Sequence, residues 1–260
     1  MVTIENGGVR FPEVEGLVMS GEMLEQHRQL WQEKPVLRAI YEDYYRRMVS
    51  HCVPGTTLEI GGGSGNLKAH RDDVISTDIV QTPWLDAAAD AQSLPFRDAA
   101  FSNILAVDVL HHIECPVKFF TEAERVLAAG GRIVLLEPGI STISGLFYRF
   151  FHPEPVDMTV NPFEDIVPNP DRRPFDANQA IPTLLFIKRR EEFEAAFSGL
   201  RVLHVNWLSL FAYPLSGGFR RWSLIPVSVV DKILQLEERI SMAVGRVLAF
   251  RLLIVLGKVN

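Results

Sequence analysis

Uninterrupted apolar runs alternate with amphipathic stretches along most of this chain. The runs are TTLEI, DVISTDI, FSNILAVDV, RIVLLEP, RVLHVNWLSLF and FRLLIVLGKV. Strands buried on both faces have such runs, whereas half-exposed strands alternate apolar and polar positions. Apolar residues at helical spacing occur instead in residues 20–51, 121–131 and 188–200. The pattern predicts an α/β fold in which a mostly parallel sheet is covered by helices on both faces.

Three regions lie outside this alternation. Residues 1–54 are expected to form N-terminal helices that act as a lid on a core at residues 55–260. Within the core, residues 138–187 are rich in proline and aromatic residues, and we call them the first insert. Residues 213–248, the second insert, hold FRRW and an amphipathic helix. Its expected apolar stripe is Val229, Val230, Ile233, Leu236, Ile240, Val244, Val247 and Leu248. Long inserts usually serve binding, so we expect both to cap a site.

Charge and cysteine content exclude several classes of protein. The net charge is −6 over 260 residues, which argues against a nucleic-acid partner. From Arg201 onward, eight basic residues face three acidic ones, so this end is positive. Cys52 and Cys115 have no metal-ligand spacing and indicate two free thiols. The N-terminus lacks a signal-peptide pattern, and the uncharged run 202–219 is a poor membrane span, so we predict a cytoplasmic protein.

The glycine-rich stretch TLEIGGGSGNL, residues 57–67, carries the most specific chemistry. A nucleoside-triphosphate loop ends in Gly-Lys-Ser/Thr, and a dinucleotide fingerprint needs a third glycine where Asn66 stands. Glu59, two residues before Gly61, would repel a pyrophosphate but favours a cation. A ligand with an ammonium, a sulfonium and a ribose fits this combination, and S-adenosylmethionine has these groups.

Acidic residues follow the next strands in turn. Asp78 ends the second strand, where a carboxylate can accept hydrogen bonds from two ribose hydroxyls. Asp90 lies in the next loop, where it can accept a hydrogen bond from an adenine amino group. Asp108 ends the third run, beside the crevice in which open α/β sheets bind ligands.

These motifs resemble those of the class I S-adenosylmethionine-dependent methyltransferases. The similarity lies in LEIGGGSGN, TDI, DAQSLPF, FSNILAVDVLHHI and RVLAAGGRIVLLEP, and is close over residues 55–138. It implies a Rossmann-like seven-stranded sheet with an antiparallel last strand, FRLLIVLGKV. It also implies S-adenosylmethionine as the cofactor and S-adenosylhomocysteine as the product. The implied cofactor contacts are Glu59, Gly61, Gly63, Gly65, Asp78, Asp90, Ala91 and Asp108.

Two adjacent histidines are the candidates for catalysis. Methyl transfer depends mainly on in-line positioning, and a base is needed only when the acceptor must lose a proton. His111 and His112 follow the strand that carries Asp108, and His112 is the preferred base. Either histidine can instead cap a helix or pack under the loop. His152, Glu154 and Asp157 are weaker candidates for orienting an acceptor, and no metal site is predicted.

The sequence therefore predicts an enzyme that methylates a small, partly apolar acceptor, most simply at oxygen. A natural product, a lipid-linked sugar or a quinone-like ring would fit. The alternatives are a non-catalytic cofactor-binding partner or regulator and a nicotinamide-dependent oxidoreductase. The basic amphipathic helix can lie on the inner face of a membrane, pack on the sheet or join a homodimer. An apolar pocket is expected under the cap, lined by some of six aromatic residues: Phe147, Tyr148, Phe151, Trp207, Phe211 and Tyr213.

Overall fold

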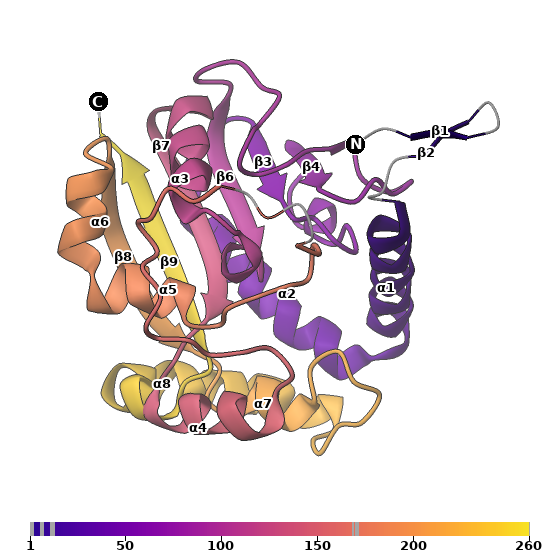
Figure 1. Cartoon of the computed structure of the whole chain (residues 1–260). Coiled ribbons are helices and arrows are strands. Elements are labelled where there is room, and N and C mark those ends of the chain that lie inside the picture. Colours follow the sequence, from indigo (N-terminus) through magenta and orange to yellow (C-terminus); the bar gives the residue numbers. More distant parts are fainter. Residues whose placement is uncertain (1–2, 6–7, 11–13, 168, 170–171, 260) are drawn as a thin grey trace.

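A seven-stranded sheet runs through the centre of the computed structural model, which describes residues 3–5, 8–10, 14–167, 169 and 172–259 (Figure 1). The strand order is β5-β4-β3-β6-β7-β9-β8. The strands are β3 (Thr57–Ile60), β4 (Val74–Asp78), β5 (Ala87–Ala88), β6 (Phe101–Val107), β7 (Leu127–Pro138), β8 (Leu200–Leu208) and β9 (Arg251–Lys258). Only β9 runs antiparallel to its neighbours in this sheet, so the prediction of a reversed last strand is confirmed.

Helices cover both faces of the sheet. They are α1 (Val14–Glu33), α2 (Pro35–Ser50), α3 (Pro116–Val126), α4 (Thr142–Phe151), α5 (Ile181–Thr183), α6 (Arg190–Ala196), α7 (Ala212–Ser216) and α8 (Val230–Leu248). Single turns occur at Leu67–Ala69, Leu110–His112 and Val227–Val229, with a π-helical turn at Leu184–Lys188. A separate hairpin near the N-terminus pairs β1 (Thr3–Glu5) with β2 (Gly8–Arg10).

Alternate residues of each central strand pack into two different cores. In β7, Ile133 and Leu135 join the core that contains Phe120 and Phe193 of α3 and α6. The residues between and after them, Val134 and Leu136, join the core formed with α2 and α8. Because successive side chains of a strand point to opposite faces, a strand covered on both sides must be apolar throughout. This explains the uninterrupted runs in the sequence.

The structure corrects two local predictions. The expected helix over residues 121–131 is wrong at its end, because α3 stops at Val126 and Leu127 pairs with Phe101 in the sheet. Backbone pairing there overrides the helix propensity of the alanines. The predicted stripe of α8 is wrong at Leu236 and Val247, which are 49% and 48% exposed. The buried face of α8 instead holds Val230, Leu234, Glu237 and Gly245.

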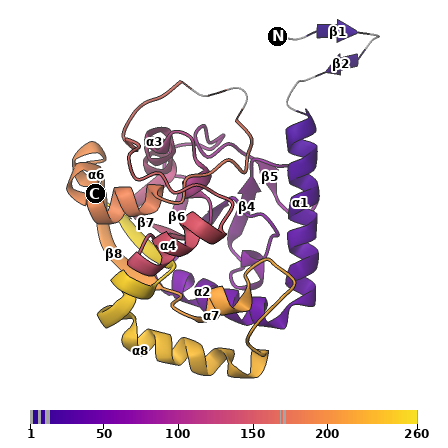
Figure 2. The same ribbon diagram turned by 60° about the horizontal axis from the view of Figure 1, so that its bottom comes forward.

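The segments that were not part of the regular alternation gather at one end of the sheet. Figures 1 and 2 show α4, α7 and α8 at the end toward which β6 and β7 point, with α1 beside β4. Strands β6 and β7 are parallel, so this is the carboxyl edge, where ligands bind in open α/β sheets. None of the described helices has the length and apolar character needed to cross a membrane.

Candidate active site

The glycine loop lies at this carboxyl edge, directly after β3. Gly61 and Gly63 have φ angles of +66° and +48°, in the left-handed region that favours glycine. A β-carbon on Gly61 would lie 2.2 Å from Cγ2 of Val109, so this glycine allows close packing of the next strand's loop. A β-carbon on Gly63 would meet nothing closer than Leu24, at 3.7 Å. At Gly63 the positive φ, and not crowding, is therefore what requires glycine.

Trp84 and α1 hold the loop from its other side. The indole Nε1 of Trp84 donates to the carbonyl of Gly63 at 2.8 Å. A β-carbon on Gly65 would lie 2.8 Å from Cδ1 of the same ring, so only glycine fits beneath it. The guanidinium of Arg28 stacks 4.5 Å above the Trp84 ring and donates to the carbonyl of Ser64 at 3.4 Å. These contacts fasten α1 to the glycine loop.

Asp78 at the end of β4 is fixed by the backbone on both sides. The amide of Gly63 donates to its Oδ2 and the amide of Val80 to its Oδ1, both at 3.0 Å. Burial raises the pKa of Asp78, and these hydrogen bonds oppose that rise. A carboxylate has about four acceptor positions, so two backbone donors leave room for two hydroxyl donors.

Glu59 lies beneath the loop rather than at its mouth. Its side chain is buried, and the hydroxyl of Ser76 donates to Oε2. A β-carbon on Gly62 would lie 3.1 Å from the same Oε2, so this carboxylate directly supports the loop. Burial raises the pKa of Glu59 to about 7. A cationic ligand on the other side of the loop would restore its charged form.

Asp90 and Ala91 follow β5 along the same edge. Ala91 is buried, whereas Asp90 is exposed and its Oδ1 accepts the amide of Gln92 at 2.8 Å. This turn places Asp90 at the rim of the site. Its predicted contact with an adenine amino group stays a prediction.

Asp108, after β6, belongs to a network that the sequence did not indicate. Arg251, at the start of β9, donates to Asp108 through both terminal nitrogens, at 2.5 and 2.9 Å. The hydroxyl of Tyr41 donates to the same carboxylate at 3.3 Å. Burial opposes ionisation of Asp108, but Arg251 outweighs it and lowers the pKa. The Arg251 guanidinium also lies 4.2 Å from the ring centre of Tyr213. This cation–π contact connects the second insert to the network.

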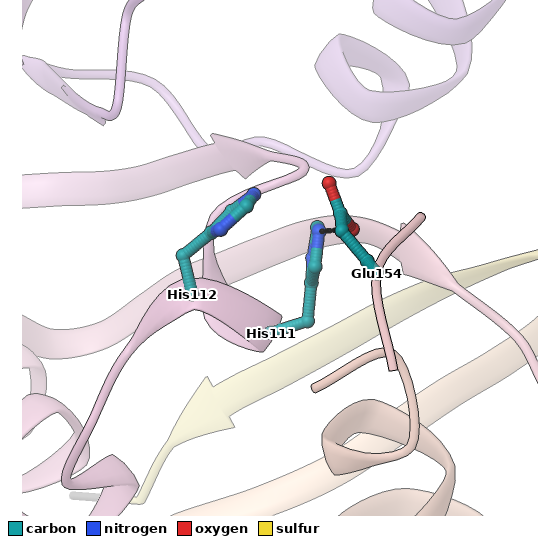
Figure 3. Close-up of side chains that lie close together, drawn as sticks. All are labelled: His111, His112 and Glu154. Carbon is teal, nitrogen blue, oxygen red and sulfur yellow. Dashed lines mark ion pairs between the residues drawn. The ribbon is translucent and has the colours of Figure 1, made fainter. Parts of the chain in front are cut away.

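His111 is buried and held by carboxylates on two sides. Its Nδ1 lies 2.8 Å from Oε2 of Glu137, the penultimate residue of β7. Its Nε2 lies 3.6 Å from Oε2 of Glu154, in the first insert, as the dashed line in Figure 3 marks. Burial alone would lower the pKa of His111, but Glu137 and Glu154 raise it to about 9.

His112 lies beside His111, with ring centres 4.1 Å apart, and Figure 3 shows both rings near the carboxylate of Glu154. Burial and the neighbouring His111 lower its pKa to about 4, so this ring is neutral near pH 7. The Nδ1 atom of His112 is buried and has no hydrogen-bond partner among the described residues. Of the two histidines, His112 is thus the one with a free ring nitrogen.

Asp157 and His152, the two other candidates from the first insert, are not part of the cluster formed by His111, His112 and Glu154. Asp157 is exposed and accepts from the backbone and hydroxyl of Thr159. His152 follows α4 and stacks edge-on against Tyr148. The sequence grouped His152 with Glu154 or Asp157. In the structure Nδ1 of His152 accepts the backbone amide of Glu154 at 3.3 Å, and the carboxylate of Glu154 lies with His111 and His112.

Lys34 joins the N-terminal helices to the second insert. This buried amine lies between α1 and α2 and donates to four backbone carbonyls, at 2.6 to 3.0 Å: Ser216, Gly218, Arg220 and Trp222. Phe219, inside the same loop, packs on His27 and Tyr41. The FRRW motif thus wraps the end of the lid helices and leaves Arg220 and Arg221 exposed.

The aromatic residues expected to line a pocket divide into two groups. Tyr148 is buried and donates to the carbonyl of Phe250 at 3.0 Å, and Tyr213 lies over Arg251. Phe147 and Phe151 are 37% and 69% exposed, so these two of the six candidates do not line an enclosed pocket. They lie on the outer face of α4, because Ser144 and Tyr148 occupy its buried face.

Sequence reasoning missed Glu137 and Arg251 as site residues. Both carried the same signal, a charged residue directly beside an apolar run, in RIVLLEP and FRLLIVLGKV. Charges in such strands are rarely buried unless they are paired. The expected partners, His111 and Asp108, lay at neighbouring strand ends.

Comparison with known proteins agrees with this geometry. A family model described as a methyltransferase domain matches residues 58–135, which include the glycine loop, Asp78, Asp108 and both histidines. Residues 58–135 therefore carry a methyltransferase domain. The resemblance drawn from the motifs is confirmed, as is the expectation of S-adenosylmethionine as the cofactor.

Relatives of this methyltransferase domain are distant. An uncharacterized protein of Methanocaldococcus jannaschii is 33% identical over 104 residues, which are 37% of this chain and 51% of that protein. The chain thus spans about half the length of the curated relative it matches.

Two solved methyltransferases share the fold. An S-adenosylmethionine-dependent methyltransferase of Thermotoga maritima, a possible histamine N-methyltransferase, is 14% identical with a TM-score of 0.55 over 94% of this chain and all of that one. The 1,6-didemethyltoxoflavin-N1-methyltransferase of Burkholderia thailandensis, which binds S-adenosylhomocysteine, is 13% identical with a TM-score of 0.50. The match covers 100% of this chain and 95% of the Burkholderia chain.

Proposed function

We propose that this protein transfers the methyl group of S-adenosylmethionine to an oxygen of a small, partly apolar acceptor. The observation that carries the proposal is the convergence of two sets of groups at one edge of the sheet. Gly63 and Asp78 supply a backbone surface and acceptors for a ribose. His112, with its free ring nitrogen, follows three residues after Val109, which packs against Gly61.

On the cofactor side, each group has a separate task. Asp78 accepts the two ribose hydroxyls with the acceptor positions that its backbone donors leave free. Glu59 balances the positive charge of the ligand from below the loop. Asp90 accepts from the adenine amino group at the exposed rim, and Asp108 lies at the end nearest the acceptor.

On the acceptor side, the reaction needs alignment and removal of a proton. Alignment of the acceptor with the methyl group provides a large part of the rate. A hydroxyl acceptor must also lose its proton, and the neutral ring of His112 suits this task better than His111, which Glu137 and Glu154 keep protonated. The N-terminal helices and the two inserts surround this point and exclude water when they close.

The test is a methyl-transfer assay on two pools of acceptors. Purified protein and isotopically labelled S-adenosylmethionine are incubated separately with lipid extract and with water-soluble extract of the source cells. We expect a labelled product that is heavier than its precursor by one methyl in place of one hydrogen. His112→Ala should slow its formation by about 10²- to 10⁴-fold while cofactor affinity holds.

Three other outcomes would each replace the proposal. Tight cofactor binding without any methylated product, from either extract, would favour a non-catalytic partner subunit. Binding of a nicotinamide dinucleotide instead of S-adenosylmethionine would favour an oxidoreductase. A labelled product that carries its methyl on nitrogen would retain the enzyme class but overturn the assignment to oxygen.

We also propose that the acceptor is reached from a membrane surface. Helices α4 and α8 lie side by side, joined by the hydroxyl of Ser141 on the carbonyl of Val247, and both appear on the near side of Figure 2. Large apolar side chains are exposed on them, between 37% and 98%: Ile143, Leu146, Phe147, Phe150, Phe151, Leu236, Met242 and Val247. An apolar face of this kind marks an interaction surface.

The charges on this face select its partner. Helix α4 contains no acidic residue, and exposed Arg149, Arg239 and Arg246 accompany the apolar side chains of α4 and α8. The two acidic residues at the centre of α8 are occupied, because Glu237 accepts the amides of Phe211 and Ala212, and Glu238 pairs with Arg47. Basic and apolar groups together suit anionic lipid. A second copy docked through the same face would place its arginines against like charges.

A further inference from the structure

Three side chains that can bind a metal ion meet at the carboxyl edge of the sheet, after β6. His111 and His112 come from the single turn after β6, and Glu154 comes from the first insert (Figure 3). One ligand atom of each lies within 4.8 Å of the others. Two imidazoles and one carboxylate form a donor set that suits divalent transition metals such as Zn²⁺ and Fe²⁺. Sequence spacing does not indicate this cluster, because Glu154 lies more than forty residues after the histidines.

The groups around His111 have the arrangement that surrounds metal-binding histidines. A histidine that binds a metal usually donates its second ring N–H to a carboxylate, which fixes the tautomer and turns the other nitrogen toward the ion. Glu137 is fully buried and lies 2.8 Å from Nδ1 of His111. Its other oxygen accepts the amides of Val109 and Leu110 at 2.9 and 2.8 Å, so the carboxylate cannot turn away. This leaves Nε2 of His111 facing Glu154.

His112 supplies the independent observation. Its Nδ1 is buried without a hydrogen-bond partner among the described residues, although buried polar atoms are nearly always paired. The His112 ring also makes a hydrogen bond with the backbone of Asp176. Nδ1 takes no part in this bond, because it has no partner among the described residues. One ring nitrogen of His112 is therefore left free to bind a ligand.

The backbone of the cluster is held on both sides. The amide of Asn178 donates to the carbonyl of His111 at 2.8 Å, and Arg172 donates to the carbonyl of His112 at 2.9 Å. The side-chain Nε2 of Gln179 donates to Oε2 of Glu154 and orients its carboxylate. The first insert therefore holds the backbone of both histidines without using their ring nitrogens, and it binds one oxygen of Glu154.

We propose that Nε2 of His111, Nδ1 of His112 and the carboxylate of Glu154 bind one divalent transition-metal ion. The role of the ion rests on the proposed function. An ion here would draw the hydroxyl oxygen of the acceptor to the methyl group and lower the pKa of that hydroxyl, which is the task otherwise assigned to His112. Three protein ligands leave open positions for such an oxygen.

The rival explanation is an internal ion pair in which a protonated His111 satisfies Glu137 and Glu154 without any metal. The two explanations differ in what binds to the pure protein. Tag-free protein is stripped with a chelator and titrated with Co²⁺, whose visible absorption reports nitrogen and oxygen ligands, and then with Zn²⁺ in competition. We expect one Co²⁺ per chain, displaced by Zn²⁺.

Two variants and one matched control locate the ion. Glu154→Gln and His112→Asn should each weaken Co²⁺ binding by at least about tenfold, since even residues that only orient a ligand change metal affinity by about 10- to 100-fold. His204→Ala is the control, because His51 and His204 form the other close histidine pair, with ring centres 5.3 Å apart. Binding that survives Glu154→Gln and His112→Asn but is lost in His204→Ala would overturn the proposal, as would the absence of saturable binding.

This test is separate from that of the proposed function. Co²⁺ binding is measured without cofactor or acceptor, and S-adenosylmethionine affinity is measured by calorimetry on the same variants. We expect Glu154→Gln to retain wild-type cofactor affinity. Metal binding at the cluster with no methyl transfer to any acceptor would refute the function and leave the site intact. Methyl transfer at an undiminished rate by chelator-treated, metal-free protein would refute the role of the ion.

Discussion

The proposed cofactor half and the proposed acceptor half of this site are assembled in different ways. In the cofactor half, residues 55–138, contacts join neighbouring strands of the sheet: Gly63 with Asp78, Ser76 with Glu59. In the acceptor half, contacts join segments far apart in the chain. Arg251 meets Asp108, Lys34 meets the loop at 216–222, and Glu154 meets His111. The pairing of parallel strands determines the contacts of the cofactor half. The contacts of the acceptor half depend on how the inserts fold.

The difference predicts where substitutions act. A change in the cofactor half should affect one ligand and leave the rest of the molecule intact, because the sheet holds its neighbours. A change in the acceptor half should instead affect the packing of inserts, a bound ion or a surface.

The largest expected effect on ligand affinity is in the cofactor half. Asp78→Ala removes an acceptor for the proposed ribose hydroxyls, and each hydrogen bond to a charged group contributes about 1.5 to 3 kcal/mol. Loss of two such bonds should weaken S-adenosylmethionine binding by at least about 10²-fold in calorimetry. Asp98→Ala, an exposed acid at the opposite edge of the sheet, is the control and should bind normally. Equal affinity in both variants would remove Asp78 from the cofactor site.

Much of the cofactor half could be predicted from the sequence, for a physical reason. The strands are uninterrupted apolar runs, their ends carry the polar residues, and parallel strand ends share one edge. The positions of Gly61, Gly63 and Asp78 therefore followed from the order of motifs. The buried position of Glu59 did not, since the path of a side chain beneath a loop depends on Ser76 of the next strand.

The acceptor half could not be predicted to the same extent. Glu154 lies in a segment with no periodic pattern, so nothing in the sequence tied it to His111. The aromatic side chains of the first insert suggested an inner lining, but α4 turns Phe150 and Phe151 outward. The proline and aromatic content of the first insert showed that it is unusual. Only the fold showed which face of α4 is exposed.

The next effect in size joins stability to cofactor binding through Glu59. Its pKa is raised by burial from an ordinary value of 4.5 to about 7 in the folded protein. A raised pKa means that the folded state binds the proton more tightly than the unfolded state. Its contribution to stability is therefore fully present below about pH 4.5 and is lost as the pH rises through about 7. The difference corresponds to about 3 kcal/mol.

Glu59→Gln separates the two roles. The variant lacks this titration and does not lose stability through it as the pH rises. The difference in free energy of unfolding, variant minus wild type, should therefore increase between pH 5 and pH 8 in denaturant titrations. Its affinity for S-adenosylmethionine should fall at pH 8, because a neutral amide no longer balances the cationic ligand. A variant whose stability keeps a constant offset from the wild type across this range would show that Glu59 is ionised throughout.

The smallest effect concerns the outer face of the acceptor half and leaves folding unchanged. Phe151 is 69% exposed on α4, and Arg246 is exposed on α8. A basic residue near an anionic membrane contributes about 1 kcal/mol, and partial insertion of an aromatic ring contributes a similar amount. Phe151→Ser and Arg246→Gln should therefore each weaken sedimentation with phosphatidylglycerol vesicles by about fivefold, and the melting temperature should not change.

Val167→Ser is the matched control, since Val167 is 89% exposed but lies in the first insert away from α4 and α8. It should bind these vesicles as the wild type does. Vesicles of phosphatidylcholine alone should bind more weakly, and added salt should weaken binding to the anionic vesicles, because exposed charges are screened. A dimer in solution that Phe151→Ser dissociates, with no binding to either kind of vesicle, would assign this face to a second copy instead. The membrane proposal thus depends on lipid charge and on Phe151 together, because neither exposed apolar area nor positive charge alone distinguishes a lipid surface from a protein partner.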